Sequence, residues 1–253
     1  MNHFFENVTL LITHYNRSAS LERLLISYKN LECSFGEIII SDDGSNQEHL
    51  EKLASLKEAH NFKLILSPQN KGLGNNINKG QDAVSTPYTL YVQEDFEPAT
   101  DFPYHFKNAL DIFDERTDLD IIRFYSYLKY PYLRSYKDGF SEMYIKLWAT
   151  DYKKIYFYSD HPHLRRSSFL NKFGRYAEGV KGDRTEYLMC VSFIRNKGKG
   201  LFFENYQSLF FQKNSSTEPS TMTRSNWTQS SNLFISVIRD VYRQIKYNFD
   251  LLR

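Results

Sequence analysis

The sequence predicts an α/β protein with a layered, Rossmann-like fold around a mostly parallel mixed sheet, followed by an amphipathic C-terminal helix. Two observations predict it. Within the first hundred residues, short apolar runs alternate four times with segments whose apolar residues recur at helical spacing. Polar and acidic residues directly follow three of those apolar runs. Because right-handed crossovers bring the carboxyl ends of parallel strands to one edge of a sheet, we expect these polar residues to meet there.

The composition is that of a globular protein. A chain of 253 residues is long enough for one large domain, and its formal net charge of +2 gives no sign of a nucleic-acid partner. The 19 Tyr and 20 Phe suit an aromatic core and also the flat faces of sugars. Cys33 and Cys190 lie in no metal-like spacing, which predicts reduced thiols in a cytoplasmic protein. No window is apolar enough to span a bilayer, so we expect a soluble protein, attached at most to the inner surface of a membrane.

The first predicted strand covers residues 8–13 (VTLLIT), a compact apolar run typical of a strand buried on both faces. Ser18 then offers a cap for a helix, and Gly36 leads into a second strand at 38–40. The remaining elements of this half are helices over 47–60 and from 74 toward 83, and strands at 62–66 and 88–93.

The pattern loosens from residue 101 onward. A polar stretch rich in Ser and Thr, residues 213–224, is predicted to be a mobile loop. The expected elements are helices over 106–113, 165–173 and 185–195, and strands at 119–124, 143–149, 154–158, 201–203 and 208–211.

The last predicted element is an amphipathic helix over residues 232–253, whose apolar stripe lies apart from its basic residues. We expect this helix to dock on its own domain. The alternative is a basic amphipathic helix that lies on an anionic membrane. The stripe comprises Phe234, Val237, Ile238, Val241, Ile245, Phe249 and Leu252, and the basic residues are Arg239, Arg243, Lys246 and Arg253.

Polar residues after the first two strands are candidates for binding a nucleotide. Asp42 and Asp43 open a turn after the second strand, where one carboxylate would suffice for a helix cap. We expect a carboxylate here to accept hydrogen bonds from uracil N3–H or from ribose hydroxyls. Thr13 and Tyr15, with Asn16 beyond them, are expected to flank the base. A plain turn with a helix cap is the alternative.

A glycine-containing segment, residues 70–75 (NKGLGN), opens the third helix. Unpaired N–H groups at helix N-termini favour anions, so Lys71 and its neighbours are candidates for contacting a phosphate. The segment matches neither the G-x-G-x-x-G pattern nor the P-loop. A plain loop-to-helix junction would look much the same.

The strongest single signal is Gln93, Glu94 and Asp95 at the end of the strand over 88–93. Acidic residues have poor strand propensity and are costly to bury unpaired. Clustered carboxylates hold hard divalent cations, which in turn hold phosphate oxygens. We therefore expect Asp95, assisted by Glu94, to bind Mn²⁺ or Mg²⁺. An exposed acidic turn is the alternative.

Four segments, VTLLITHYNR, IIISDDGS, NKGLGNNINKG and LYVQEDFEP, resemble in that order the nucleotide-binding half of a family 2 glycosyltransferase with the GT-A fold. The resemblance implies an inverting enzyme that moves a sugar from a nucleoside-diphosphate sugar, with a UDP-sugar favoured. The acceptor is a hydroxyl of a glycan or lipid-linked glycan in surface-polysaccharide biosynthesis. The family's D-x-D motif corresponds to residues 93–95, where Gln93 replaces the first Asp. Gln212 stands where some relatives carry a metal-binding His.

The resemblance also implies a catalytic base, a carboxylate near the start of a helix in the second half that deprotonates the acceptor hydroxyl. Glu186, just inside a predicted helix, fits that position best. Asp183 is the second candidate and Glu178 the third. A capping-box arrangement of Asp183 and Glu186 is the alternative reading.

Residues 159–166 (SDHPHLRR) precede the segment that holds the candidate base. Two histidines here are separated by a proline and have no third ligand nearby in the sequence, which argues against a metal site. We expect them to form a wall of the sugar or acceptor site, with Arg165 or Arg166 pairing with a phosphate.

The predicted organisation is a single GT-A domain in which residues 1–100 bind the nucleotide sugar and residues 101–225 bind the acceptor. Residues 226–253 form the C-terminal amphipathic helix. Two alternative functions stay open. One is a non-catalytic nucleotide- or glycan-binding relative. The other is a sugar-nucleotide nucleotidylyltransferase, which would require a glycine-rich, basic loop after the first strand.

Overall fold

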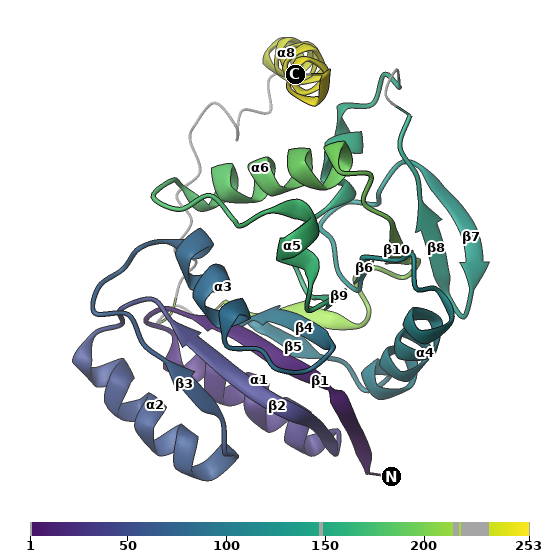
Figure 1. The fold of residues 1–253 in the computed structure, drawn as a ribbon. Helices are drawn as coiled ribbons and strands as arrows, with labels where there is room; N and C mark the ends of the chain where they lie inside the picture. The colour runs from purple at the N-terminus through teal and green to yellow at the C-terminus, as the bar shows by residue number, and fades with distance from the viewer. Residues whose placement is uncertain (1, 147–148, 215–217, 219–232, 253) are drawn as a thin grey trace.

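The structure is a computed structural model that describes residues 2–146, 149–214, 218 and 233–252. Helices cover both faces of a central mixed sheet (Figure 1). Within the described residues this sheet has nine strands in the order β3-β2-β1-β4-β9-β6-β10-β8-β7. The predicted layered α/β fold is thereby confirmed.

The N-terminal half of the sheet is parallel. Its strands are β1 (His3–His14), β2 (Cys33–Asp42), β3 (Lys63–Ile65) and β4 (Tyr88–Gln93). β1 pairs with both β2 and β4, and β2 pairs with β3. The crossover helices are α1 (Ser18–Asn30), α2 (Gln47–His60) and α3 (Leu73–Asp82).

The second half of the sheet mixes directions. β9 (His163–Arg166) runs antiparallel between β4 and β6 (Ile121–Arg123). Beyond β6 follow β10 (Gly200–Phe203), β8 (Phe140–Met143) and β7 (Leu133–Lys137). A separate two-stranded sheet joins β5 (Phe96–Pro98) to β11 (Phe210–Gln212).

The helices of this half are α4 (Phe102–Glu115), the 3₁₀ helix η1 (Tyr152–Phe157), α5 (Phe169–Phe173), α6 (Gly182–Arg195) and α8 (Leu233–Leu252). α8 contacts α6 and η1. Among the described residues, no helix combines the length and apolar character that crossing a bilayer requires.

Several predictions of local structure are wrong. Residues 165 and 166, expected to begin a helix over 165–173, belong to strand β9, because β4 and β6 pair with that strand from both sides. The strand expected at 143–149 is absent after Met143, where β8 ends, among the residues described there. Residues 152–157 form a 3₁₀ helix where a strand was expected at 154–158. The N-cap of α1 is Arg17, and Ser18 is the first residue of the helix. The polar stretch 213–224 lies mostly outside the described residues.

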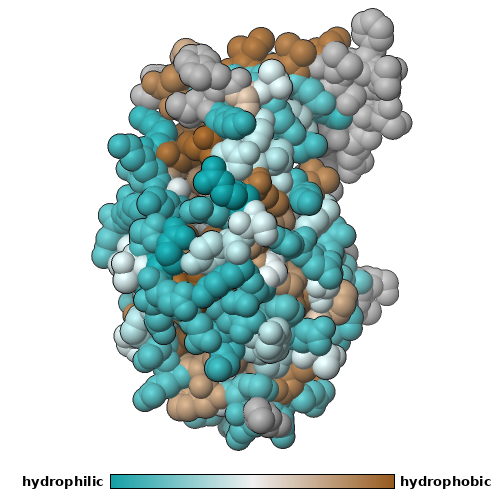
Figure 2. Space-filling view, turned by 90° about the vertical axis from the view of Figure 1, so that its right-hand side faces the viewer, coloured by the Kyte–Doolittle hydropathy of each residue, from teal (hydrophilic) through white to brown (hydrophobic). Residues whose placement is uncertain are grey.

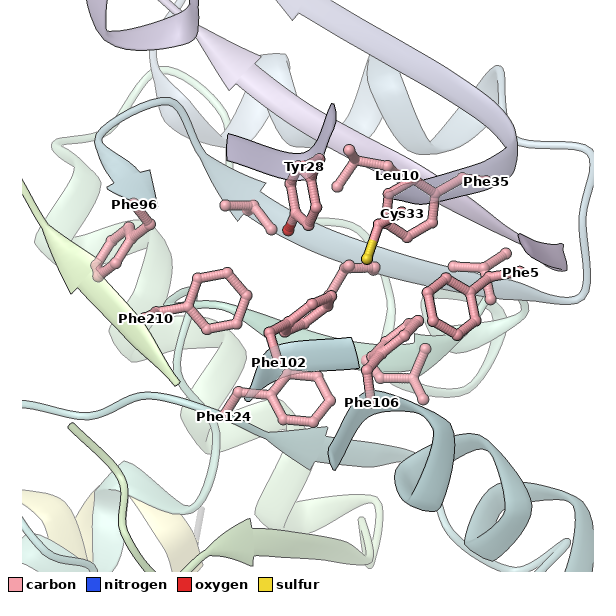
Figure 3. Packing of buried hydrophobic residues seen from close by; sticks show 14 of the residues in the cluster. Phe5, Leu10, Tyr28, Cys33, Phe35, Phe96, Phe102, Phe106, Phe124 and Phe210 are labelled. Atoms are coloured by element: carbon pink, nitrogen blue, oxygen red, sulfur yellow. The ribbon is translucent and has the colours of Figure 1, made fainter. Parts of the chain in front are cut away.

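Two aromatic-rich cores hold the layers together. On one face of the sheet, α1, α2 and α4 pack through rings such as Phe102 and Phe106, whose centroids are 5.0 Å apart (Figure 3). On the other face, α3, α5 and α6 enclose a second cluster that includes Phe193. The high aromatic content therefore serves mainly core packing. Cys33 and Cys190 are buried free thiols, as predicted.

Candidate functional site

The candidate site forms where β1, β2 and β4 end. The three strands are parallel neighbours, and Thr13 stands opposite both Ser41 and Gln93 in register. His14 likewise stands opposite Asp42. The polar residues that follow the three strands therefore share one edge of the sheet, as the sequence predicted.

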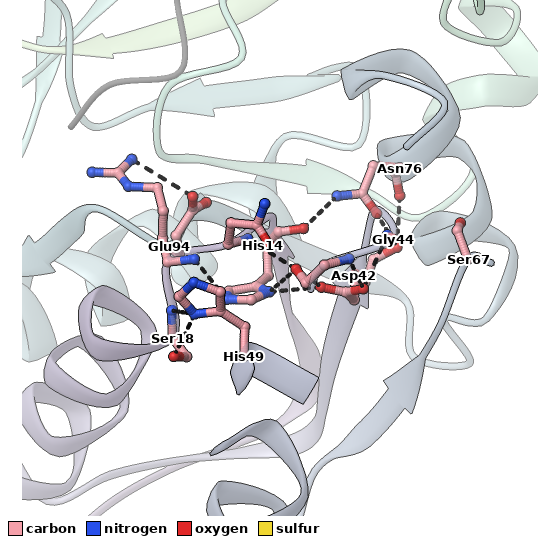
Figure 4. Close-up of polar contacts among 12 residues, drawn as sticks. His14, Ser18, Asp42, Gly44, His49, Ser67, Asn76 and Glu94 are labelled. Atoms are coloured by element: carbon pink, nitrogen blue, oxygen red, sulfur yellow. Dashed lines mark hydrogen bonds and ion pairs between the residues drawn. The ribbon is translucent and has the colours of Figure 1, made fainter. Parts of the chain in front are cut away.

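Asp42 anchors the turn after β2 (Figure 4). Its buried carboxylate accepts from His14 Nδ1–H at 2.8 Å, from the N–H groups of Gly44 and Ser45 at 3.0 Å each, and from the Ser45 hydroxyl at 2.5 Å. The N–H of Arg17 donates to His14 Nε2, so His14 carries its hydrogen on Nδ1. Burial favours a raised pKa for Asp42, but hydrogen bonds from His14 and Ser45 outweigh it and lower that pKa. These bonds use every lone-pair site of the carboxylate, so Asp42 holds the turn in this conformation.

Asp43, the second acid of the turn, joins β2 to the loop before α3. Its Oδ1 accepts from the backbone N–H of Lys71 at 2.9 Å, and its Oδ2 accepts from that of Gly72 at 2.8 Å. Burial raises the pKa of Asp43, and the neighbouring Asp42 adds to the rise. Lys71 contributes its backbone here and exposes its side chain. Each oxygen of Asp43 can accept a further hydrogen bond from a ligand.

Gly44 and Lys79 hold that loop against the turn. At Gly44, φ is +74° and an added Cβ would lie 2.3 Å from the backbone carbon of Gln69, so the two backbones touch. Lys79, from α3, donates to the carbonyl oxygen of Asp42 and, at 2.6 Å, to the Ser67 hydroxyl. Burial lowers the pKa of Lys79. The turn and the loop thus form one interlocked block beside the strand ends.

Glu94 and Asp95 follow β4 and meet Arg17, which follows β1. One Nη atom of Arg17 lies 3.1 Å from Asp95 Oδ2. The same atom lies 3.6 Å from Glu94 Oε1, and Figure 4 shows the Glu94 side chain. All three residues are at most 9% exposed. Burial and the adjacent Asp95 raise the pKa of Glu94 to about 8, against the lowering effect of Arg17. An arginine of the chain itself therefore balances the charge of the acidic strand end.

Asp95 and Glu94 also offer what a divalent cation requires. Asp95 Oδ1 is buried without a hydrogen-bond partner, while Oδ2 accepts from Gln212 Nε2 at 2.8 Å. In the part of the chain that the structure describes, no three His, Cys, Asp or Glu side chains gather as a metal site. One or two carboxylates completed by substrate phosphates are a usual ligand set for Mg²⁺. These residues fit an ion held jointly with a diphosphate.

Arg17 also holds a segment that comes from near the end of the chain. Its Nη2 donates to Asn214 Oδ1 at 2.6 Å and to the Glu218 carbonyl oxygen at 3.3 Å. The Glu218 carboxylate accepts from the N–H groups of Ala19 and Ser20 at 2.9 and 2.8 Å. Burial by itself would raise the pKa of Glu218, but these hydrogen bonds outweigh burial, and the pKa is lowered. Glu218 thus caps α1 and carries its charge at the positive end of that helix.

A second pair of carboxyl groups lies beside the end of β4. β9 runs antiparallel to β4 with His163 opposite Tyr91, so the residues before His163 run back past that end. Glu186, on α6, accepts from the Ser159 hydroxyl at 2.9 Å and from the Asp160 N–H at 3.3 Å. Asp160 is 7% exposed, and burial followed by the adjacent Glu186 raises its pKa well above the usual value. Asp160 therefore keeps its proton to a higher pH than a free carboxyl group does, with Glu186 beside it.

The sequence identified Glu186 as a candidate but gave Asp160 no role. The only local signal is an acidic residue just before a strand, and the pattern predicts a helix from residue 165, inside that strand. Asp183 is exposed in the first turn of α6, and the N-cap Lys181 makes no side-chain cap. The capping-box alternative therefore does not form, and Glu186 instead faces the segment 159–160.

His161 lies between the two acidic regions. Its ring meets those of Tyr125 and Tyr127 at centroid distances of 5.5 and 4.6 Å. Tyr127 donates to Gln212 Oε1 at 2.5 Å, and Gln212 in turn donates to Asp95. Burial lowers the pKa of His161 to about 4, so the ring is uncharged near neutral pH. An aromatic wall thus connects the acidic strand end to the carboxyl pair.

The remaining candidates for base and ribose contacts line the end of β1. The Thr13 hydroxyl lies 3.0 Å from the Tyr91 phenol. Tyr15 is half-buried, and Asn16 accepts from the Asn46 N–H at 2.8 Å. Asn16 has a φ of +51°, which Asn tolerates better than most residues. These side chains share the edge with Asp43, as expected from the strand order.

Arg165 and Arg166 do not lie where a phosphate could reach them. Arg165 is fully buried and donates to the Tyr176 hydroxyl and, at 2.8 Å, to Gln81 Oε1. Arg166 donates to backbone carbonyl groups, including that of Leu119 at 2.8 Å. The prediction that one of them pairs with a phosphate is wrong, because β9 turns both side chains into the body of the protein.

Comparisons with known proteins agree with this fold. The family model described as "Glycosyl transferase family 2" matches residues 9–174. A poly-beta-1,6-N-acetyl-D-glucosamine synthase of Staphylococcus epidermidis is 31% identical over 100 residues, which are 40% of this chain and 24% of that protein. The chain thus matches only about a quarter of the length of this relative.

Two solved structures are similar in fold. S. aureus TarS 1-349 in complex with UDP-GlcNAc gives a TM-score of 0.63 at 17% identity, covering 87% of this chain and 62% of that one. The mannosyltransferase PcManGT from Pyrobaculum calidifontis, in complex with GDP-Man and Mn2+, gives a TM-score of 0.54 at 12% identity. That match covers 78% of this chain and 54% of the other. At these identities the likeness concerns the fold.

Proposed function

The chain belongs to glycosyl transferase family 2, and we propose that it moves a sugar from a nucleoside-diphosphate sugar to a hydroxyl group of a glycan or lipid-linked glycan, with inversion. One observation carries the proposal. The Asp43 and Asp95 carboxylates at the shared edge of β1, β2 and β4 lie beside a second pair of carboxyl groups, Asp160 and Glu186. The reaction requires a nucleotide site next to a proton acceptor.

A UDP-sugar is the favoured donor, and the first to test is UDP-N-acetylglucosamine. TarS is similar in fold and its structure holds UDP-GlcNAc, and the curated relative is named for a polymer of N-acetylglucosamine. The structure of PcManGT with GDP-Man makes GDP the second nucleotide to test. The proposed role is in surface-polysaccharide synthesis.

The proposed nucleotide contacts follow the chemistry of the strand ends. Thr13, Tyr15 and Asn16 border the base, and Asp43 accepts from the ribose or the base. Asp42 supports this contact by holding the turn. The exposed side chain of Lys71, next to that turn, offers positive charge to the phosphates.

Asp95 would hold Mn²⁺ or Mg²⁺, assisted by Glu94 and with Gln93 alongside. The buried Asp95 Oδ1 without a partner supports this assignment. When bound, such an ion supplies a Lewis acid that stabilises the negative charge of the leaving diphosphate. Arg17 contributes positive charge to the same strand end.

Glu186 is proposed to accept the proton of the acceptor hydroxyl, with Asp183 as the second candidate. As that proton leaves, the acceptor oxygen bonds to the anomeric carbon and the bond from this carbon to the phosphate oxygen breaks. The electron pair stays on the nucleoside diphosphate. Hydrogen bonds from Ser159 and the Asp160 N–H orient Glu186 for this step.

We further propose that the protein acts in the cytoplasm or at the inner membrane surface. Its two buried free thiols are consistent with a reducing compartment. A glycan acceptor carried on a lipid would be presented at that surface.

The proposal is tested by calorimetric titration with UDP, with and without Mn²⁺, and by UDP release from UDP-GlcNAc. We expect Mn²⁺-dependent UDP binding that is lost in Asp95→Ala. The exposed Asp111 on α4 provides a matched control, and Asp111→Ala should bind as the wild type does. UDP binding that depends on neither Mn²⁺ nor Asp95 would contradict the proposed metal site. No binding of UDP, GDP or dTDP would contradict the transferase proposal.

A non-catalytic nucleotide-binding relative is the second candidate. The observation that favours it is the Arg17–Asp95 ion pair, which balances the acidic strand end without a metal. Tight UDP binding with no release of UDP from any donor, in the presence of lipid-linked and soluble glycans, would support this candidate.

A further inference from the structure

The helix α8 turns an apolar face toward solvent. Among its described side chains, residues 238–252, every exposed one is apolar, and each is between 54% and 65% exposed. Their spacing of mostly three and four residues places them in one stripe along the helix. Hydrophobic residues gather along the top of the molecule in Figure 2, the level at which α8 lies in Figure 1. This outer α8 face comprises Ile238, Val241, Tyr242, Ile245, Phe249 and Leu252.

The other side of α8, which carries polar groups and the buried Leu251, attaches the helix to the protein. Arg243 donates to the Tyr152 hydroxyl at 3.2 Å, and Tyr187 of α6 donates to the Asp250 carboxylate. The Tyr247 ring packs at 5.1 Å from that of Tyr187. A helix on the surface of a soluble protein normally buries its apolar stripe. The helix docks on its own domain, as expected, but through the face opposite its apolar stripe.

Basic groups border the outer α8 face. Lys246 follows Ile245 and lies four residues after Tyr242, so on the helix it flanks the outer α8 face. The described part of α8 carries more cations than carboxylates. The cations are Arg239, Arg243 and Lys246, and the carboxylates are Asp240 and Asp250.

We propose that the outer α8 face lies on the surface of an anionic lipid bilayer. Its aliphatic and aromatic side chains would enter the boundary between headgroups and acyl chains, with the neighbouring cations at the level of the lipid phosphates. A second copy of the chain fits less well, because six side chains of one helix are far fewer than the roughly 20–30 residues per side of a stable interface. Since no described helix can span a bilayer, the contact is peripheral.

This docking would orient the proposed site toward the acceptor. Glu186 precedes Tyr187, and Tyr187 holds α8 through Asp250 and Tyr247. The helix α6 therefore carries the candidate base and also holds α8, the helix proposed to face the membrane. The inference rests on the proposed function insofar as it names a lipid-linked glycan as the acceptor, whereas the docking itself stands on the outer α8 face.

The test is flotation of the full chain with vesicles, either of phosphatidylcholine alone or with added phosphatidylglycerol. We expect binding to the anionic vesicles that weakens with salt, and a loss of roughly tenfold or more in Ile245→Asp/Phe249→Asp. Both residues are more than 60% exposed, so the variant should keep the wild-type melting temperature. The matched control is Ile26→Asp/Tyr104→Asp, which changes exposed apolar residues on α1 and α4 and should float as the wild type does.

Three outcomes would overturn the docking. They are a wild type that floats with neither vesicle, a double variant that floats unchanged, and a wild-type dimer in sedimentation velocity that Ile245→Asp/Phe249→Asp converts to monomer. UDP calorimetry without vesicles separates this inference from the proposed function. If the wild type binds vesicles but no nucleotide, the docking is supported and the transferase proposal is contradicted. If it binds UDP but floats with neither vesicle, the nucleotide site is supported and the docking is contradicted.

Discussion

Two pairs of acidic side chains border the end of β4, and they differ in what balances their charge. Glu94 and Asp95 lie 3.6 and 3.1 Å from an Nη atom of Arg17. Asp160 and Glu186 have no Lys or Arg at ion-pair distance within the described ranges, and burial together with their contact raises the pKa of Asp160. Both pairs contain a carboxyl group of raised pKa, Glu94 in one and Asp160 in the other, but only the first pair has an arginine beside it.

The difference indicates two kinds of chemistry within one site. A carboxylate pair that already tolerates a cation can hold a divalent ion on a diphosphate. A carboxyl pair without a neighbouring cation suits proton transfer from a hydroxyl group. The variants below test whether the two pairs divide the work in this way.

Glu186→Gln is expected to have the largest effect. It removes the proposed proton acceptor, so kcat for UDP release should fall by about 10²- to 10⁴-fold while UDP binding by calorimetry is retained. Asp183→Asn decides between the two candidates, and we expect it to leave most of the activity. If Asp183→Asn abolished turnover and Glu186→Gln did not, the base would be Asp183.

Arg17→Met should destabilise the protein by about 3–5 kcal/mol in denaturant unfolding, because it leaves Glu94 and Asp95 buried without their cation. Mn²⁺ should restore more stability to this variant than it adds to the wild type. The control is Arg23→Met, which breaks the more exposed pair with Glu97 and should cost about 1 kcal/mol or less. Equal costs for the two variants would mean that Arg17 does not balance the acidic strand end.

The pH dependence of stability should separate Asp160 from Asp42. Because the pKa of Asp160 is raised from 3.8, the folded state binds more protons above that pH than the unfolded state does, and stability falls as the pH rises. Asp42, whose pKa is lowered, stabilises above its unfolded pKa and loses that contribution as the pH falls. The titratable groups that interact with Asp160 include Glu186, Asp183 and Cys190 on α6, Tyr91 on β4, and Tyr158 and Tyr176.

Asp160→Asn should therefore flatten the decline of stability between about pH 4 and pH 7, by at most about 1.4 kcal/mol per pH unit. Thermal unfolding across this range measures the slope. A wild-type slope that the variant leaves unchanged would show that the pKa of Asp160 is not raised in the folded protein.

The smallest expected effect is that of Gln212→His. Gln212 donates to Asp95 at 2.8 Å, so a His there would add a nitrogen ligand beside the carboxylate. We expect Mn²⁺ in the presence of UDP to bind at most about tenfold more tightly, as measured by calorimetry. Gln207→His, at an exposed position, is the control and should change nothing. Weaker Mn²⁺ binding in Gln212→His would argue against a metal at Asp95.

The first half of the fold could be predicted because its signals are local. Each strand from β1 to β4 is a short apolar run followed by turn residues, and α2 and β4 have the predicted boundaries. β9 could not be predicted in this way, because its sequence HLRR contains two arginines. It is a strand because two neighbours pair with it, and those neighbours are distant in the sequence.

In the candidate site, too, the residues with a local signal could be predicted and those that meet through distant contacts could not. The sequence pointed to Asp43 and Asp95 through the polar ends of strands, and the strand order brings those ends together. It gave no role to Asp160, whose partner on α6 is 26 residues away. It also gave no sign that Arg17 pairs with Asp95, since nothing in the local sequence of either residue indicates the other.

The sequence by itself determined the parallel half of the sheet and the acidic end of β4, because apolar period and turn chemistry act over a few residues. Only the tertiary structure decided which carboxyl groups are neighbours, which arginine balances them and which face of α8 is exposed. These depend on contacts between distant segments, and such contacts set the burial, and hence the charge, of each group.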